Sequence, residues 1–132
     1  MSMLLTGSVS SVPRREDGLR LLVTRFRGRG LSADAYDVWM ANLGPSEALL
    51  RSFLDGTVAW NEFGRRYRDE MFAPSSIDDR NKTIRNRGQL HSMRLIKHLA
   101  EAGPVTLLCH CHGDATECHR FLLRDLILSK KV

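Results

Sequence analysis

The sequence has no apolar run close to the roughly 20 residues that a membrane span requires, and it has only three cysteines in 132 residues. An odd and low cysteine count excludes a disulfide-rich secreted scaffold and favours free thiols. The first 13 residues lack a basic start before their short apolar stretch, so we expect no secretory signal and a cytoplasmic protein without membrane partners. With 42% apolar and 27% charged residues, the chain has the composition of an ordinary globular protein, and its length predicts one domain over 1–132.

Lysine is also scarce, since only 4 of the 20 basic residues are Lys and 16 are Arg. The net charge is +5. The planar guanidinium group suits bidentate binding of phosphate and carboxylate better than the lysine ammonium does. The arginine surplus therefore favours a phosphate-bearing partner, either a nucleotide or a nucleic acid. The alternative is that most of these side chains are simply solvated.

Three apolar segments predict strands: 3–9, 20–26 and 105–109. The connection between the first two is too short for a helical crossover, so these strands should be antiparallel if they are neighbours. The third, Val-Thr-Leu-Leu-Cys, is continuously apolar, which is typical of a strand buried on both faces.

Helical periodicity fills most of the remaining chain. We expect a helix from Ser32 or Asp34 to Leu43, with Tyr36, Trp39 and Met40 on its apolar face, and a second helix from Ser46 to Gly56. Further helices are predicted from Thr57 through Met71, from Leu90 to Gly103, and from about Glu117 to Lys130. The aromatic stripes are expected in the core, with base stacking by Trp39 or Trp60 as the alternative. The polar, basic stretch 74–88 is expected to be a loop insert.

These elements predict a single-domain α/β fold with a small mixed, largely parallel sheet packed with helices, with Rossmann-like three-layer character.

The most informative local feature is the segment 109–119, which holds all three cysteines and three of the five histidines. It begins where the buried strand ends and leads into the last helix, the place where open α/β sheets bind ligands. We expect Asp114 or Thr116 to cap that helix. Helical spacing places His119 toward the protein body, with Cys118 and Arg120 on either side. A helix start favours anions and would favour a thiolate at Cys118.

Three interpretations of this segment are open, besides an inert structural cluster. The sequence favours the first, an anion-binding crevice for a phosphate-bearing ligand, in which the helix start meets the Arg-rich turn 25–30, whose glycines permit close backbone approach. Its ligand-binding residues would be Arg25, Arg27, Arg29, Arg120 and Asp114.

The second interpretation is a zinc site, for which the candidate ligands are Cys109, Cys111, His112 and Cys118. The Cys-x-Cys spacing is not the usual one for zinc. The third is nucleophilic catalysis by Cys118 or Cys111, assisted by His119 or His112. In the catalytic interpretation Cys118 and His119 are the preferred pair, whereas Cys109 is expected to be a small core residue. The sequence does not identify a cofactor, and it leaves open whether the protein is an enzyme.

Several motifs in order resemble the domain-of-unknown-function 488 family, close to its YeaO-like branch. They span nearly the whole chain: 17–25 with 29–32, Leu-Gly-Pro-Ser at 43–46, Trp-Asn-Glu-Phe at 60–63 before Arg66-Tyr67, 105–109, and a Cys-His-Arg signature at 118–120. The resemblance implies a small cytoplasmic α/β protein of unestablished activity, for which metal or nucleic-acid involvement is suspected. It gives candidate status to Cys118, His119, Arg120, Arg25 and Arg29. The 74–88 stretch is longer than the family usually carries.

Overall fold

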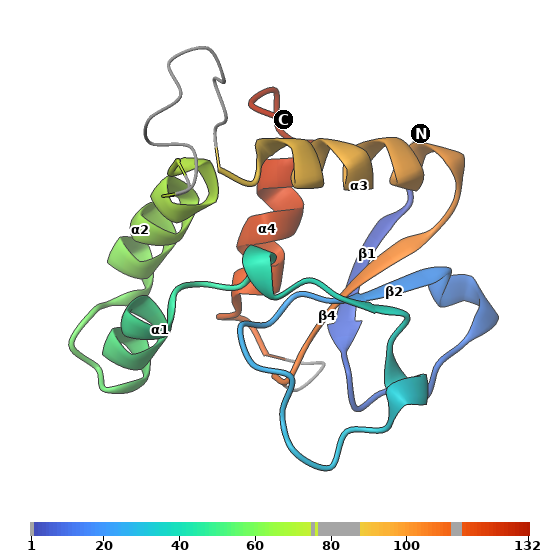
Figure 1. The fold of residues 1–132 in the computed structure, drawn as a ribbon, viewed down its shortest axis with the longest axis horizontal. Coiled ribbons are helices and arrows are strands. Elements are labelled where there is room, and N and C mark those ends of the chain that lie inside the picture. Colours follow the sequence, from blue (N-terminus) through green and yellow to red (C-terminus); the bar gives the residue numbers. More distant parts are fainter. Residues whose placement is uncertain (1, 75, 77–87, 112–114) are drawn as a thin grey trace.

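The computed structural model describes residues 2–74, 76, 88–111 and 115–132. These residues form four strands and four α-helices, and short 3₁₀ turns separate β1, β2, β3 and α1 (Figure 1). The strands are β1 (Leu4–Ser8), β2 (Leu19–Leu22), β3 (Val38–Trp39) and β4 (Val105–Cys109). The helices are α1 (Glu47–Leu54), α2 (Trp60–Phe72), α3 (Leu90–Ala102) and α4 (His119–Leu128).

The sheet has the order β1-β4-β2-β3, and each neighbouring pair is parallel. Val105 is opposite Leu4 on one side and Leu19 on the other. Every residue of β4 is buried, because the strand is paired along both edges and covered on both faces. This confirms the strand predicted at 105–109, and it places the end of that strand, Cys109, at the middle of one sheet edge.

The α/β fold class with helices packed on a sheet is confirmed, but the sheet differs in detail from the expectation. In the described part of the chain it is wholly parallel rather than mixed. An antiparallel pair of β1 and β2 was expected only if these two strands were neighbours. They are not neighbours, because β4 lies between them.

The two faces of the sheet are covered differently. Side chains from all four α-helices join Leu4, Leu21 and Leu107 in one core cluster on the first face. On the second face, Leu22 and Leu108 belong to a smaller cluster that the loop around 31–36 covers. Among the described residues no α-helix covers this second face, so the expected three-layer arrangement is not met.

A buried arginine fixes that loop to the second face. Arg20, in β2, is only 4% exposed. Its Nη1 lies 2.5 Å from the Asp17 carboxylate, its Nε donates to the Ala35 carbonyl at 3.0 Å, and its Nη2 donates to the Ser11 carbonyl. The charge is compensated by Asp17 and by carbonyl oxygens, as burial of a guanidinium requires.

Most predicted helices are confirmed, with one exception. α1 follows Ser46, whose hydroxyl accepts a hydrogen bond from the Leu49 amide. α2 begins at Trp60 after Ala59, so Thr57 is not its cap. The helix predicted from 32 or 34 to 43 is wrong: β3 and two 3₁₀ turns occupy this segment. Trp39 is 41% exposed in this segment, and its indole Nε1 donates to the Thr24 carbonyl at 2.8 Å.

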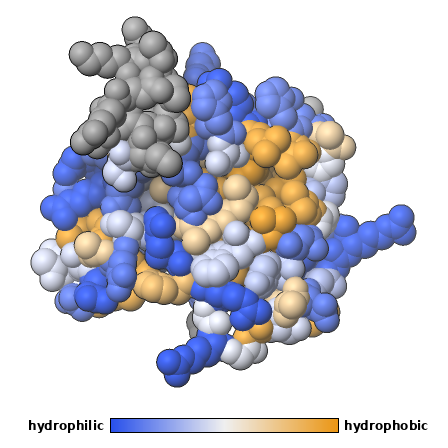
Figure 2. Space-filling model, in the orientation of Figure 1, coloured by the Kyte–Doolittle hydropathy of each residue, from blue (hydrophilic) through white to orange (hydrophobic). Residues whose placement is uncertain are grey.

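The 74–88 insert lies almost entirely outside the described residues. In the described part of the chain, none of the helices is both long enough and apolar enough to cross a bilayer. The molecular surface is largely polar in the view of Figure 2, with an apolar area toward its upper right.

Gly18 permits the close approach of two chain segments at the start of β2. It has a φ of +63°, and a Cβ built there would lie 1.9 Å from the Pro104 carbonyl oxygen. That oxygen accepts a hydrogen bond from the Leu19 amide at 3.1 Å. We predict that Gly18→Ala lowers the free energy of unfolding by at least about 2 kcal/mol, measured by urea denaturation. Gly30→Ala is the matched control, because its φ is also positive but nothing lies within 4 Å, and it should cost only about 1 kcal/mol. Equal losses in the two variants would contradict the clash.

Candidate functional site

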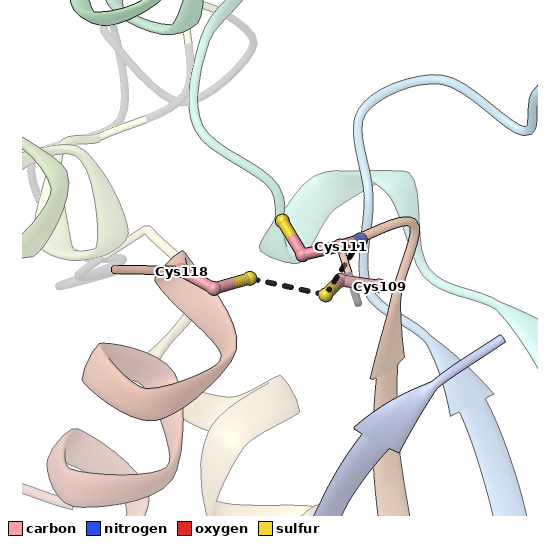
Figure 3. A group of neighbouring side chains, drawn as sticks. All are labelled: Cys109, Cys111 and Cys118. Atoms are coloured by element: carbon pink, nitrogen blue, oxygen red, sulfur yellow. Dashed lines mark hydrogen bonds between the residues drawn. The ribbon is translucent and has the colours of Figure 1, made fainter. Parts of the chain in front are cut away.

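Three cysteines converge where β4 ends and α4 begins (Figure 3). Cys109 is the last residue of β4, Cys111 follows in the connection, and Cys118 immediately precedes α4. Their three Sγ atoms lie within 4.8 Å of one another. Cys109 and Cys118 are buried, whereas Cys111 is the exposed member. The fold thus gathers the cysteines at the carboxyl edge of the sheet, as the sequence predicts.

Three hydrogen-bond donors point at one sulfur, Cys109 Sγ. The Cys118 thiol donates to it at 3.0 Å, Arg120 Nη1 at 3.1 Å, and the Cys111 backbone amide at 3.3 Å. Cys109 is therefore not the plain core residue that its apolar strand predicts. Donors that converge on a single sulfur stabilise its ionised form.

The three thiols differ accordingly in acidity. The hydrogen bond from Cys118, helped by the Cys111 amide and the Arg120 charge, lowers the pKa of Cys109 to about 6. The negative Cys109 sulfur and burial both raise the pKa of Cys118. Burial and the Cys109 charge also raise the pKa of Cys111. The donors around the pair therefore favour ionisation of Cys109 rather than of Cys118, the cysteine at the helix start.

Arg120 connects this sulfur to the neighbouring strand. It is 1% exposed, and the same Nη1 that reaches Cys109 also donates to the Gly7 carbonyl of β1 at 2.9 Å. Its guanidinium carbon lies 4.7 Å from the centre of the Phe121 ring. The side chain thus supplies a buried positive charge directly beside the thiolate.

His119 faces the protein body, as its helical position predicts. Its Nε2 lies 2.6 Å from the carbonyl oxygen of Val23, just beyond β2. A carbonyl only accepts hydrogen bonds, so Nε2 carries the ring proton and Nδ1 of the neutral ring keeps its lone pair. Burial, with smaller effects from the Arg120 and His110 charges, lowers the pKa of His119 to about 4. Nδ1 lies 4.0 Å from Cys118 Sγ.

A pocket of about 140 Å³ opens beside the cluster. Its polar and sulfur-bearing walls include Cys109, Cys111 and His119, and the apolar residues Phe26, Pro45 and Leu50 line it as well. The remaining lining residues are Thr24, Arg25 and His110. Cys109, although buried, is thus one of the residues that line this pocket.

The Arg-rich turn contributes less to this pocket than the sequence predicts. Arg25 lines it, but the Arg25 guanidinium donates to the carbonyls of Pro45 and Gly44 at 3.0 and 2.9 Å. Arg27 donates to the Tyr36 hydroxyl and the Leu31 carbonyl, both at 2.7 Å. Arg29 is exposed. Neither Arg27 nor Arg29 is among the residues that line the pocket.

Glycine is required in that turn for a contact with the cluster. Gly28 has a φ of +87°, and a Cβ there would lie 2.8 Å from the His110 ring. That ring is 3.1 Å from the Phe26 carbonyl through its Nε2. The turn therefore packs against the histidine that follows Cys109, as the close approach expected of its glycines implies.

The chain was compared with known protein families. A family model described as "Active DUF488-N3 subclade" matches residues 4–131. The chain belongs to the DUF488 family. No curated protein and no solved structure matches it. Within this family, the YeaO-like branch and the Cys-His-Arg signature at 118–120 remain predictions.

Several contacts in this DUF488 site were not predictable from residue types. The Gly7 and Val23 carbonyls that hold Arg120 and His119 are backbone atoms of other strands. Cys109 Sγ accepts hydrogen bonds from Cys118 and Arg120 because the start of α4 lies against the end of β4. The only local signal is the Cys-x-Cys spacing, because it puts the Cys111 amide within reach of Cys109 Sγ.

The three thiols are also the described groups that could hold a soft metal ion. The other predicted ligand, His112, and the predicted cap and anion-binding residue, Asp114, lie outside the described residues. Tetrahedral zinc takes four ligands at about 2.0–2.3 Å, and the thiols supply three. The guanidinium of Arg120 already neutralises one thiolate, which reduces the electrostatic benefit of a second cation.

The buried neutral state of His119 predicts a specific acid sensitivity. Its folded-state pKa of about 4 lies below the ordinary 6.5, so the unfolded chain binds a proton that the folded chain excludes. The free energy of unfolding should therefore fall as the pH drops from 6.5 to about 4, by up to about 3 kcal/mol. His119→Gln keeps a donor for the Val23 carbonyl but cannot be protonated. Urea denaturation across this range should show a shallower pH dependence for the variant; parallel curves would contradict the assignment.

Proposed function

We propose that this DUF488 protein is a cysteine-dependent enzyme in which Cys109 is the nucleophile. The observation that carries the proposal is the convergence of three donors, from Cys118, Arg120 and the Cys111 amide, on Cys109 Sγ. The thiolate is the reactive form of cysteine, and reactive cysteines have lowered pKa values beside a cation. The word "active" in the description of the matched subclade agrees with an enzymatic role.

The position of Cys109 suits catalysis as well as its charge does. It lies at the carboxyl end of the central parallel strand, where α/β proteins bind their substrates, and it lines the 140 Å³ pocket. Ligand pockets for whole small molecules measure about 300–1,000 Å³. This pocket therefore accepts the reacting end of a substrate, while the remainder extends outward past the exposed Cys111.

The reaction has two stages. In the first, the Cys109 thiolate gives its electron pair to an electrophilic substrate atom, and the leaving group departs with the electrons of the broken bond. In the second, water attacks the covalent adduct and Cys109 leaves again as the thiolate. His119 lines the pocket, and its unprotonated Nδ1 accepts the proton from that water and then passes it to the departed leaving group. Cys118 and Arg120 hold the sulfur and the charge in place between turnovers.

This proposal replaces the order of preference that the sequence gives. The preferred nucleophile moves from Cys118 to Cys109, while His119 keeps its assisting role. Binding of a phosphate-bearing ligand by Arg25, Arg27, Arg29 and Arg120 is less favoured. Three of these guanidinium groups already donate to carbonyls, to the Tyr36 hydroxyl or to Cys109.

Selective alkylation tests the nucleophile. We expect iodoacetamide to modify Cys109 with a rate that is half-maximal near pH 6, because the pKa of that thiol is about 6. The two raised pKa values should confine reaction of Cys111 and Cys118 to strongly alkaline solution, although Cys111 is the more exposed. Peptide mapping by mass spectrometry after timed alkylation measures each site. Cys109→Ser should abolish the reaction near neutral pH, and the control Cys111→Ser should retain it.

Two outcomes would overturn the proposal. One is that Cys111 or Cys118 reacts first at neutral pH while Cys109 stays unmodified in the reduced, folded protein. The other is a stoichiometric metal ion in the purified protein that is lost in Cys109→Ser, since a metal-bound sulfur is not available for attack.

The Arg120 charge should contribute to the lowered pKa of Cys109, beside the larger effect of the hydrogen bond from Cys118. In Arg120→Gln the amide still donates, but the positive charge is gone, so the pKa of Cys109 should rise toward the ordinary thiol range. The rate of Cys109 alkylation at about pH 7 should then fall about tenfold. Arg124→Gln is the matched control, because Arg124 lies on the same helix and its Nε donates to the Leu4 carbonyl at 2.8 Å. Circular dichroism would confirm that both variants are folded; equal alkylation rates in them would contradict the assigned role.

A further inference from the structure

We propose that Cys109 and Cys118 form a reversible disulfide when the protein meets a hydroperoxide, and that this disulfide switches off the nucleophile. The inference rests on the proposed function only in its last clause. Formation of the disulfide depends on the two sulfurs themselves and can be measured without a substrate.

The geometry brings the two sulfurs into direct contact. Their Sγ atoms are 3.0 Å apart, and Figure 3 shows the Cys118 side chain directed from the start of α4 toward Cys109 at the end of β4. A disulfide bond is about 2.0 Å long, so closure needs a movement of about one ångström. Cys109 is the last residue of β4 and Cys118 is the residue before α4, so this movement occurs at the ends of both elements rather than within them.

The two sulfurs also have the complementary states that oxidation requires. Cys109 accepts hydrogen bonds from Arg120 and from the Cys111 amide, which suits the attacking thiolate. Cys118 remains a thiol and donates its proton toward Cys109. Both cysteines are buried. Because their Sγ atoms are already in contact, Cys118 is positioned to react with Cys109 once Cys109 is oxidised.

The chemistry balances with a hydroperoxide as the oxidant. The Cys109 thiolate attacks the terminal peroxide oxygen, an S–O bond forms, the O–O bond breaks, and the alkoxide takes a proton from solvent to leave as an alcohol. The Cys118 sulfur then attacks the sulfenic sulfur of Cys109. The S–S bond forms as the S–O bond breaks, and the departing hydroxide takes the Cys118 proton to leave as water. Two thiols are oxidised by two electrons, and one peroxide is reduced.

The consequence for the site is loss of its anion. In the disulfide, Cys109 has no charge to offer Arg120 and no electron pair for a substrate. A dithiol reductant restores both thiols by exchange. In a reducing compartment such a bond forms transiently, which is the usual behaviour of redox-sensing cysteine pairs.

Cys111 is the competing partner, since its sulfur is also within 4.8 Å of the other two. It is, however, exposed, whereas Cys109 and Cys118 are both buried. The variant Cys111→Ser keeps the backbone amide that donates to Cys109 Sγ and removes the competing sulfur. It therefore isolates the Cys109–Cys118 pair.

The test is intact-mass spectrometry of the reduced Cys111→Ser protein after brief exposure to a few equivalents of hydrogen peroxide. We expect a loss of about 2 Da that dithiothreitol reverses, and a tryptic peptide pair joined through Cys109 and Cys118. Cys118→Ser should instead gain oxygen at Cys109, because the resolving thiol is absent. Peroxide-treated wild-type protein should lose neutral-pH alkylation of Cys109 and regain it after reduction.

Each other result decides against the proposal. Gain of oxygen at Cys109 in Cys111→Ser without a disulfide, a wild-type bridge that joins Cys109 only to Cys111, or no reaction at all would each overturn it. These results are distinct from failure of the proposed function, which is decided by alkylation of the fully reduced protein. A reduced protein with a reactive Cys109 that never forms the bridge would retain the enzyme proposal and discard this switch.

Discussion

The contact between the Arg120 guanidinium and the Cys109 sulfur is the interaction on which the site depends. A fully buried guanidinium is costly unless an anion and hydrogen-bond acceptors compensate it. Here the Gly7 carbonyl and the Cys109 sulfur are among the groups that accept hydrogen bonds from it. The guanidinium charge and an ionised Cys109 sulfur therefore stabilise each other in the protein interior. The Cys118 thiol then donates to the charged sulfur, which keeps Cys118 itself protonated.

Sheet topology places these groups together. Because β1, β4 and β2 are all parallel, their carboxyl ends meet at one edge, and the start of α4 returns to that edge. Arg120 reaches β1 at Gly7, Cys118 reaches β4 at Cys109, and His119 reaches the residue after β2 at Val23. Three consecutive residues thus contact three adjacent strands. The Cys-His-Arg sequence at 118–120 has a physical meaning in this chain: it fixes the helix start across the sheet edge.

The sequence predicts the α/β class, the buried strand 105–109, α1, α3 and the location of the site, because each rests on a local pattern. Apolar runs, capping serine and the density of cysteine and histidine are visible without a structure. The helix predicted over 32–43 is wrong, because Tyr36, Trp39 and Met40 have helical spacing but the pairing of Val38 with Leu21 in the sheet overrides that preference. Tertiary pairing is not encoded in periodicity.

The assignment of the thiolate shows the same limit in the site itself. A cysteine at a helix start is expected to ionise, and Cys118 occupies that position. In the folded protein, however, the guanidinium of Arg120 and the Cys111 amide reach Cys109 instead. Which of the two facing thiols ionises depends on which sulfur these donors reach in the folded chain. Spacing alone identified the cluster but could not rank its members.

The most direct measurement is an NMR titration of protein labelled with ¹³C at the cysteine Cβ atoms, which reports the ionisation of each thiol separately in the reduced, folded state. The account predicts that the Cys109 signal shifts with a midpoint near pH 6, whereas the Cys111 and Cys118 signals do not titrate below the ordinary thiol range. A midpoint for Cys109 in the ordinary range, or a lower midpoint for Cys118 than for Cys109, would contradict it.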